Sequence, residues 1–550
     1  MFPLVERASA PRDFLNRAPA GARQTAILFC GMATFVAYYG ACAFVARWGG
    51  DIHEYLAAIH ALYRNIWSPP HEALGLSGKY STIYSPYIVT IALIGKALGV
   101  SAYRALQIAG IFNLALYVSA IVVFFRTFSA SPRSPWPSML FLVVSLFMRS
   151  AHYAWSSETD YLSLILIQAY PSLFGWALAL FAFVLTDRAV ATRSMAAIGG
   201  VTLLIAFLVP THPITARWVI GIVGLRGLYV VLEAVWNSWR APGAFGGWQR
   251  PLATAALIGG SVFVAIVLSL LWPYYSPFLL FGFSGAQENA PFGANPFSLI
   301  PAVYVLALFA LLAWPSRVYA FWIAAFAATF GAWATYRLAG VQYGDRYVFF
   351  MAFFAQFIVA DAVVAASRRV LSSEAAVRYK GNRQRILSGA YVLLFLLAFF
   401  FSPSLAPNLA RQLVNPRAFW TAPSAERAFY TEWEPLRAVL GPTDMVMMAP
   451  SPGASNDVPA VTGAAVVAVP FAFAVPDYAD RMQSAQRFFA PGASADARIR
   501  ELKRWNATKV IVSRSLDLAP EMESLFGPPI WRDETRLVFA VKPQDLKSGD

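Results

Sequence analysis

Twelve apolar segments, separated by polar, glycine- or proline-containing loops, fill most of the first 401 residues of this chain. Roughly 20 consecutive apolar residues are enough to cross the hydrocarbon core of a bilayer as a helix. Hydrophobic residues make up 58% of the 550 residues and charged residues 13%, whereas a soluble domain has about 25% charged residues. The segments are residues 24–46, 83–98, 104–125, 137–149, 161–186, 195–210, 214–236, 252–275, 298–314, 318–337, 346–366 and 385–401. This pattern predicts an all-α polytopic membrane domain with about 11–12 transmembrane helices.

Arginine and lysine residues indicate the orientation of these helices. They gather in the N-terminal 23 residues and in the loop 367–385, next to apolar segments. The positive-inside rule places such loops in the cytoplasm. Alternation from there puts the following parts outside: the loops 150–160, 211–213, 276–297 and 338–345, and everything after residue 402.

One segment conflicts with this alternation. The loop 47–82 is also expected outside, so the segment 83–98 gives one crossing too many. This segment is short and has Pro86 near its start, so we expect it to be re-entrant or to lie on the membrane surface. The alternative is that 137–149 or 195–210 does not cross.

Several function classes are disfavoured by the sequence. The formal net charge is +14, but the basic residues flank apolar helices and no base-reading motif is present, which argues against nucleic acid as a partner. No P-loop, GxGxxG, HExxH or GxSxG motif occurs in a supporting context, which argues against a nucleotide-powered transporter and a serine or zinc protease. Cys30 and Cys42 both lie in the first apolar segment, so they cannot form an extramembrane disulfide framework. That segment is longer than a signal-peptide core and is expected to be an uncleaved anchor.

The segments 137–149 and 195–210 are too short for a full span, and each is followed by a polar break on the predicted outer side. Irregular backbone at membrane depth is tolerated only where protein or a water-filled cavity surrounds it. Two helices that stop early therefore favour a hydrated cavity on that side. The alternative is helix tilt and bilayer thinning without a cavity.

The composition changes at residue 402, after which charges are frequent and apolar runs shorten to strand length. Segments rich in Val and Ile predict strands, and segments with apolar residues at helical spacing predict helices. The expected strands are 445–448, 466–469, 509–513 and 537–542, and the expected helices are 424–440, 478–489 and 496–505. The tail is long enough for its own core. We therefore expect a cytoplasmic segment 1–23, a transmembrane domain 24–401 with the outer loop 47–82, and an extracytoplasmic α/β domain 402–550.

The outer loop 47–82 carries two carboxylates, Asp51 and Glu54, directly after the first apolar segment. A partly desolvated carboxylate at the water–lipid boundary has its pKa raised toward values that suit a general base. Asp51 is therefore a candidate base, with His53 and Glu54 as helpers; the alternative is that Asp51 caps the following helix. Residues 54–67 have apolar side chains at helical spacing, which is typical of an amphipathic helix on a membrane surface.

A second acidic pair, Glu158 and Asp160, lies in the polar break after 137–149. Together with Asp51 and Glu54 it forms a carboxylate set of the kind that Mg²⁺ or Mn²⁺ prefers. No tight ligand motif supports a metal site, so a divalent cation is an alternative and no cofactor is assigned. The other role open to the pair is that of a solvated loop.

His212 lies between two prolines at an outer helix break, and Arg346 opens the segment 346–366 from outside. An arginine at a helix N-terminus opposes the helix dipole. A bound anion reverses this, because free backbone N–H groups and a guanidinium together suit phosphate. The alternative is a local salt bridge of Asp345 with Arg346 or with Arg337.

Short motifs along most of the chain carry a family resemblance. They are Asp51-Ile52-His53-Glu54-Tyr55, Tyr84-Ser85-Pro86-Tyr87, Gly344-Asp345-Arg346-Tyr347, Asp444-Met445-Val446 and Val458-Pro459-Ala460-Val461-Thr462-Gly463. Together they resemble the GT-C superfamily of polytopic membrane glycosyltransferases, which take sugars from polyprenyl-phosphate donors on the outer face of the membrane.

The resemblance implies that Asp51 deprotonates an acceptor hydroxyl, which displaces the sugar from its lipid phosphate with inversion. Arg346 and His212 would neutralise the departing phosphate. Many relatives have two adjacent acids in the first loop, whereas Asp51 and Glu54 are separated here, so either one is a candidate for the base. The remaining candidate substrate-binding residues are His53, Glu158, Asp160 and Tyr84.

The leading hypothesis is a glycosyltransferase that moves a sugar from a polyprenyl-phosphate donor to an envelope glycan, lipid or protein acceptor. The alternatives are a transporter or flippase of lipid-linked sugars, for which no internal hydropathy symmetry is evident, and a ligase or polymerase of surface polysaccharide. Abundant Ala and an excess of Arg over Lys are typical of a GC-rich bacterial source. The expected location is therefore the bacterial cytoplasmic (inner) membrane, with the donor, the acceptor and the lipid bilayer as partners.

Overall fold

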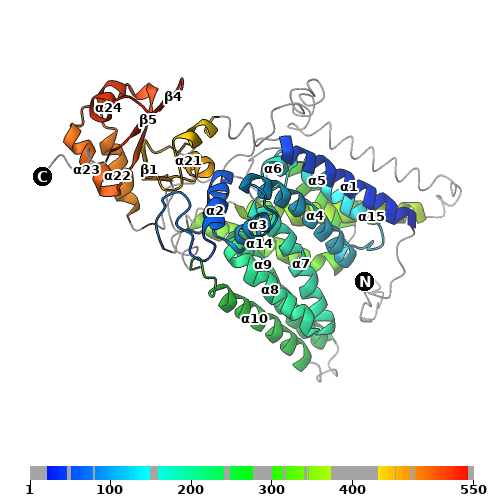
Figure 1. Cartoon of the computed structure of the whole chain (residues 1–550). Coiled ribbons are helices and arrows are strands. Elements are labelled where there is room, and N and C mark those ends of the chain that lie inside the picture. The colour runs from blue at the N-terminus through cyan, green and yellow to red at the C-terminus, as the bar shows by residue number, and fades with distance from the viewer. Residues whose placement is uncertain are drawn as a thin grey trace. The chain divides into compact units, whose positions relative to one another are not determined.

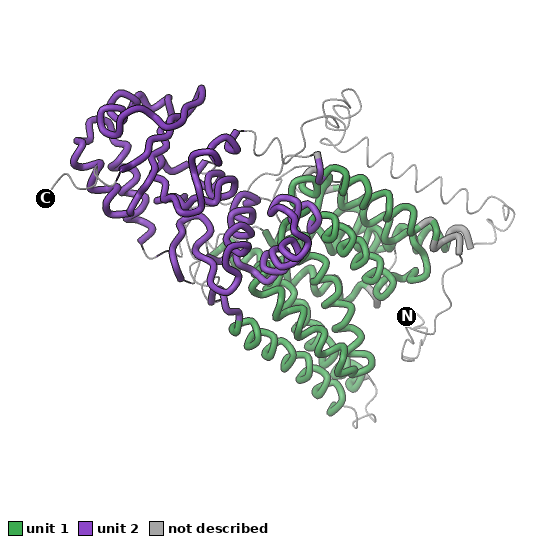
Figure 2. The backbone as a smooth tube through the Cα atoms, viewed as in Figure 1, with its two compact units in different colours: residues 1–42, 110–271, 289–416 green, residues 43–109, 272–288, 417–550 purple. Residues whose placement is uncertain are grey.

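The computed structural model describes residues 22–45, 51–78, 81–148, 159–240, 248–276, 300–313, 317–339, 344, 346–372, 432–451, 454–470, 475 and 477–542. The chain divides into two compact units. Unit 1 comprises residues 1–42, 110–271 and 289–416, and unit 2 comprises residues 43–109, 272–288 and 417–550 (Figure 2). Unit 1 is helical in its described parts, whereas unit 2 combines helices with a small sheet (Figure 1).

Within the described ranges, five helices are long and apolar enough to cross a membrane. They are α4 (Ala102–Phe128), α7 (Pro171–Thr192), α9 (Pro213–Arg240), α10 (Gln249–Ser269) and α15 (Tyr347–Ser372). The other long or apolar helices are α1 (Ala22–Val45), α3 (Pro86–Ala97), α5 (Trp136–Phe147), α8 (Met195–Thr211), α13 (Pro301–Ala313) and α14 (Arg317–Leu338). The predicted polytopic helical class is therefore confirmed. The expected segment 385–401 lies outside the described residues, so the total helix number stays a prediction.

Helix α15 lies at the centre of unit 1, because 89% of its apolar stretch is buried inside the protein. Trp218 of α9 stacks on Phe350 of α15, with 4.3 Å between ring centroids and 5° between ring planes. Phe124 of α4 approaches Phe353 of α15 edge to face, at 5.4 Å between centroids. Such aromatic pairs add about 0.5–1.5 kcal/mol each to the effect of burial. The core of unit 1 is therefore an aromatic layer around α15.

A buried carboxylate of α15 joins the end of α4 and the start of α14 in unit 1. Asp361 of α15 is fully buried and accepts hydrogen bonds from the Tyr319 hydroxyl (2.9 Å), the Ala130 N–H (2.9 Å) and the Ser129 hydroxyl. The alternation of the loops across the membrane, and the side that these residues face, stay predictions.

The expected helix 161–186 is wrong, because the structure breaks it into α6 (Tyr161–Leu166) and α7. Pro171 lacks an N–H group and starts the new helix. Backbone carbonyls of the break are satisfied inside the protein, because the Asn113 side-chain amide donates to those of Gln168 (2.8 Å) and Tyr170 (3.5 Å). The Gln168 side-chain amide in turn donates to the carbonyl of Tyr39 in α1 (2.8 Å). Irregular backbone is tolerated in such a buried, hydrogen-bonded place.

Helix α3 belongs to unit 2 and has 12 residues, which span about 18 Å at 1.5 Å per residue. This is well short of a bilayer core of about 30 Å. The length therefore fits the expected re-entrant or surface helix. The Lys96 ammonium at its end donates to the carbonyl of Tyr63 (2.8 Å), which ties α3 to α2 (Ile52–Arg64).

Unit 2 contains a five-stranded sheet in the order β2-β1-β3-β5-β4. The strands are β1 (Met445–Met448), β2 (Ala465–Val466), β3 (Lys509–Ser513), β4 (Trp531–Arg532) and β5 (Arg536–Ala540). β1 is parallel to β2 and β3, whereas β3, β5 and β4 are antiparallel neighbours. The helices beside them are α21 (Ala454–Thr462), α22 (Tyr478–Phe488), α23 (Ala495–Trp505) and α24 (Ala519–Phe526). The expected α/β character of the tail is confirmed.

The predicted elements of the tail agree with the structure to different degrees. Strands 445–448 and 509–513 and helices 478–489 and 496–505 match within about one residue. The strand expected at 466–469 is only β2, and the helix expected at 424–440 is, in its described part, the 3-10 helix η2 (Glu434–Ala438). α21, α24 and β4 were not predicted.

The first outer loop is joined to the sheet of unit 2. The Val466 N–H donates to the carbonyl of Ala73 (2.8 Å), so the loop adds to the edge strand β2. At Gly75, which has a φ of +66°, a Cβ atom would lie 2.8 Å from the Cβ of Ala465. Only glycine fits such a close approach at positive φ. Residues 51–78 thus pack with the tail, although the sequence assigned them to the transmembrane domain. The domain boundary expected at residue 402 stays a prediction.

Candidate functional site

Asp51 stands at the N-terminus of α2 and is exposed. Its backbone carbonyl accepts from the Tyr55 N–H (3.2 Å), but its side chain makes no capping hydrogen bond. A capping aspartate accepts from the N–H of the second or third helical residue. The structure therefore does not support the capping alternative, and the role of Asp51 as base stays a prediction.

Helix α2 is amphipathic, but a membrane is not what covers its apolar face. Its buried residues are Ile52, Tyr55, Leu56, Ala57, Ala58, Ile59, Ala61 and Leu62. They pack mainly against α21 and α3, two elements of the same unit. The expectation that the membrane covers this apolar face is wrong. Helical periodicity predicts that a face is buried, but it does not tell which part of the protein or membrane covers it.

The two residues expected to help Asp51 both contact α21. The His53 imidazole lies against the carboxylate of Asp457, and the Asn456 amide donates to the Glu54 carboxylate (3.4 Å). The side chains of His53 and Asp457 are 22% and 15% exposed, so this contact is largely shielded from water. His53 and Glu54 are thus tied to the tail of the chain.

The second acidic pair is only half described, because Glu158 lies outside the described residues. Asp160 is fully buried, and its carboxylate accepts from the Ser163 N–H (2.7 Å) as the cap of α6. The solvated-loop alternative is therefore wrong for Asp160, since capping requires the carboxylate to face the helix end. Its contact with substrate stays a prediction.

The carboxylates considered for Mg²⁺ or Mn²⁺ are not gathered in the described part of the chain, where no group of three His, Cys, Asp or Glu side chains is placed to hold a metal. Asp51 and Glu54 belong to unit 2, and Asp160 belongs to unit 1 and is engaged in helix capping. A dependence on a divalent cation stays an open alternative.

His212 and Arg346 come together in unit 1. His212 ends α8 and is buried, and its Nδ1 is hydrogen-bonded to the Thr215 hydroxyl (2.7 Å), which fixes the orientation of the ring. Arg346 directly precedes α15 and lies within electrostatic range of His212. Arg217, one turn into α9, lies within electrostatic range of Tyr347, the first residue of α15 and the one that follows Arg346. Arg217 was not predicted.

Asp345, the carboxylate of the salt-bridge alternative, lies outside the described residues. The first N–H groups of a helix have no intrahelical partner. A guanidinium beside such N–H groups forms a site that suits a phosphate group.

Tyr84 holds the first outer loop together. It is 2% exposed, its hydroxyl donates to the carbonyl of Pro70, and its own carbonyl accepts from the indole N–H of Trp272 (2.9 Å). Its ring lies 6.0 Å from that of Tyr274. These contacts are structural, while the predicted contact with substrate stays a prediction.

The sequence reasoning missed three ionisable residues of unit 2. His71 and Glu72 are buried in the outer loop, and the Nδ1 of His71 accepts from the N–H groups of Ala73 and Leu74 (3.3 Å each). Burial, with the charges of Arg437 and Arg64, lowers the pKa of His60 to about 4. A neutral histidine inside an apolar helix face leaves no signal in the sequence that separates it from a surface histidine.

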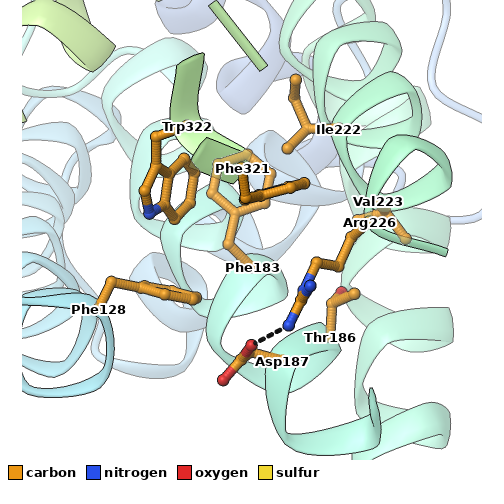
Figure 3. A pocket seen from close by; sticks show the side chains of 9 residues that line it. All are labelled: Phe128, Phe183, Thr186, Asp187, Ile222, Val223, Arg226, Phe321 and Trp322. Atoms are coloured by element: carbon orange, nitrogen blue, oxygen red, sulfur yellow. Dashed lines mark hydrogen bonds and ion pairs between the residues drawn. The ribbon is translucent and has the colours of Figure 1, made fainter. Parts of the chain in front are cut away.

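A cavity at another place in unit 1 is too small for a sugar. Phe128, Phe321 and Trp322 surround the ion pair between Arg226 and Asp187 (2.9 Å) there (Figure 3). The cavity has a volume of about 10 Å³, which is room for about one water molecule. It carries no argument for a substrate site.

Comparison with known proteins gives a likeness of structure. No protein-family model and no curated protein sequence matches the chain. ArnT from Cupriavidus metallidurans, solved with bound undecaprenyl phosphate, is 14% identical with a TM-score of 0.54, over 95% of this chain and 99% of that one. The oligosaccharyltransferase AglB from Archaeoglobus fulgidus, solved with an inhibitory peptide and a dolichol-phosphate, is 11% identical with a TM-score of 0.52, over 91% and 71%.

A second structure of the Archaeoglobus fulgidus oligosaccharyltransferase, tethered to an acceptor peptide, is 14% identical with a TM-score of 0.51, over 91% of this chain and 70% of that one. The chain therefore shares the fold of ArnT and of this oligosaccharyltransferase, in agreement with the fold expected from the sequence resemblance.

Proposed function

We propose that this protein is an inverting glycosyltransferase that moves a sugar from a polyprenyl-phosphate donor to an envelope glycan, lipid or protein acceptor. The observation that carries the proposal is the meeting of His212 with Arg346 at helix ends of unit 1, in a chain with the GT-C fold. A phosphate group is the ligand that these side chains and the start of α15 suit best.

The proposed reaction needs one base and one site for the leaving group. Asp51 takes the proton of an acceptor hydroxyl, whose oxygen forms a bond to the anomeric carbon of the sugar. The bond from that carbon to the phosphate oxygen breaks, and the polyprenyl phosphate leaves with the bonding electrons. Backside attack inverts the anomeric centre.

The leaving phosphate gains negative charge in the transition state, so cations held in place beforehand accelerate the step. Arg346 and Arg217 are the proposed cations, and His212 is the proposed hydrogen-bond donor. The Thr215 hydroxyl on Nδ1 fixes the imidazole so that it does not have to reorient during the reaction.

The proposed location is the bacterial cytoplasmic membrane, with unit 2's tail on the outer side, where lipid-linked sugars meet their acceptors. Support comes from the apolar helices and from the basic loops that the positive-inside rule assigns to the cytoplasm.

Binding of undecaprenyl phosphate to the full chain in detergent tests the phosphate site without knowledge of the sugar. We expect Arg346→Gln to weaken binding by roughly tenfold or more, because hydrogen bonds to charged groups contribute about 1.5–3 kcal/mol. Arg188→Gln is the matched control, since Arg188 is an exposed arginine of α7. Equal dissociation constants for wild type and Arg346→Gln would contradict the proposal. Transfer assays run with Mg²⁺ and with a chelator decide the cation dependence.

A further inference from the structure

Helix α21 contacts the first turn of α2 through two adjacent side chains. Asp457 lies against the imidazole of His53, and Asn456 donates to the carboxylate of Glu54. Both helices belong to unit 2. Two neighbouring residues of one helix therefore hold two neighbouring residues of the other, directly beside Asp51.

The far end of α2 is fixed to the same element. The guanidinium of Arg64 donates to the carbonyl of Gly463 (2.9 Å), the residue after α21. Between these polar contacts, α21 buries Val458 and Val461 completely or almost completely. Arg437 donates to the carbonyl of Val461 (2.7 Å), which adds a polar contact to the end of α21. α2 and α21 thus run side by side in the same direction, with both ends attached.

The polar contacts at the start of α2 have a specific effect. The first turn of a helix has N–H groups without intrahelical partners and frays more easily than the middle. The Asp51 side chain makes no capping hydrogen bond that would oppose this. The contacts of His53 and Glu54 with α21 therefore add to the backbone hydrogen bond from the Tyr55 N–H to the Asp51 carbonyl in fixing this turn.

We propose that Asp457 and Asn456 are positioning residues for the base, acting through His53 and Glu54. The proposal rests on the proposed function, since it assigns Asp51 as the base. Precise placement of a catalytic group changes the rate of the chemical step, whereas binding of a donor that does not contact α21 is unaffected.

Kinetics of the full chain in proteoliposomes test this proposal. We expect Asp457→Ala to lower kcat for sugar transfer by about tenfold while the KM for the polyprenyl-phosphate donor stays within about twofold. Asp457→Asn keeps a side-chain oxygen where the carboxylate contacts the His53 imidazole, so it is expected to restore most of the lost rate. Asp480→Ala is the control, because Asp480 pairs with Arg504 (2.8 Å) in the same unit away from α2. The proposal would be overturned if Asp457→Ala left kcat unchanged, or if Asp457→Asn lost as much kcat as Asp457→Ala.

Amide hydrogen exchange provides a second measurement that needs no turnover. In Asp457→Ala, residues 52–55 are expected to exchange faster, whereas α22 keeps its wild-type protection. Uniformly faster exchange would show a general loss of folding, and unchanged exchange at 52–55 would contradict the positioning role. Failure of the proposed function has a different signature: full turnover of Asp51→Asn, with the exchange result unaltered.

Discussion

His60 shows how the interior of unit 2 disfavours charge. It belongs to the buried side of α2, where desolvation and the nearby cations Arg437 and Arg64 act together. Each of these effects penalises the imidazolium form. The folded protein therefore keeps His60 neutral down to a pH of about 4, whereas an unfolded chain protonates it near its ordinary pKa of 6.5.

This difference predicts a pH dependence of stability. Because the folded pKa lies below the unfolded one, the unfolded state binds more protons below pH 6.5. The stability of unit 2 is therefore expected to fall as the pH drops from about 6.5 to about 4. His60→Gln cannot be protonated and should flatten this part of the curve. Protection factors of α2 amides, corrected for intrinsic exchange, measure the effect; parallel curves for wild type and variant would contradict it.

Single residues differed in how well the sequence predicted them. Asp51 and Arg346 were chosen as candidates because a carboxylate or a guanidinium at a helix end requires a reason, and their roles stay predictions. Asp361 and Asp160 were harder, because their partners, such as Tyr319 and the Ser163 N–H, are identified only by the fold. Arg217 was missed because nothing in its neighbourhood separates it from any arginine in a helix.

Among the elements, α2 and α3 depend on close packing. At Gly95 of α3, an added Cβ atom would lie 2.6 Å from the Cβ of Ala105 and would also clash with the hydroxyl of Tyr63. That hydroxyl donates to the carbonyl of Val100 (3.1 Å), so it cannot move without losing a hydrogen bond. Gly95 is thus needed for the approach of α2, α3 and the start of α4.

Two glycine substitutions test this packing. In a helix, Gly→Ala usually stabilises by about 0.5–1 kcal/mol. Gly95→Ala is expected to destabilise instead, by about 1–3 kcal/mol, because the added methyl overpacks the contact. Gly199→Ala in α8 is the control, since no atom lies within 4 Å of the added Cβ, and it should be neutral or stabilising. Thermal unfolding of the full chain in detergent compares them; a Gly95→Ala midpoint at or above the Gly199→Ala value would contradict the account.

The elements also show where periodicity stops being informative. Long apolar runs predicted α4, α9 and α15 within a few residues. The run 161–186 concealed a break, because buried amides such as that of Asn113 satisfy its backbone. α21 was missed since Pro459 lies inside it and its polar first turn resembles a loop. Periodicity identified the apolar face of α2, but not α21 as its cover.

At the scale of the whole molecule, segments that are far apart in the sequence belong to the same compact unit. Residues 43–109 pack with residues 417–550, although more than 300 residues separate them in sequence. Charge and hydropathy are local properties and cannot report such a pairing. Contacts such as Val466 with Ala73 and Arg64 with Gly463 become visible only in three dimensions. The fold class, in contrast, follows from composition, since a chain so rich in apolar residues has few alternatives to helices in a bilayer.

The proposed transfer depends on activation of the acceptor hydroxyl by Asp51. Transfer from a panel of undecaprenyl-phosphate-linked hexoses, pentoses and aminosugars, catalysed by the full chain in proteoliposomes, tests it most directly. Asp51→Asn is expected to lower kcat by roughly 100-fold or more, in the range of general-base catalysis, with undecaprenyl phosphate binding and thermal unfolding unchanged. Glu54→Gln, which removes the neighbouring acid, should cause a smaller loss. Turnover of Asp51→Asn close to the wild-type rate would contradict the account.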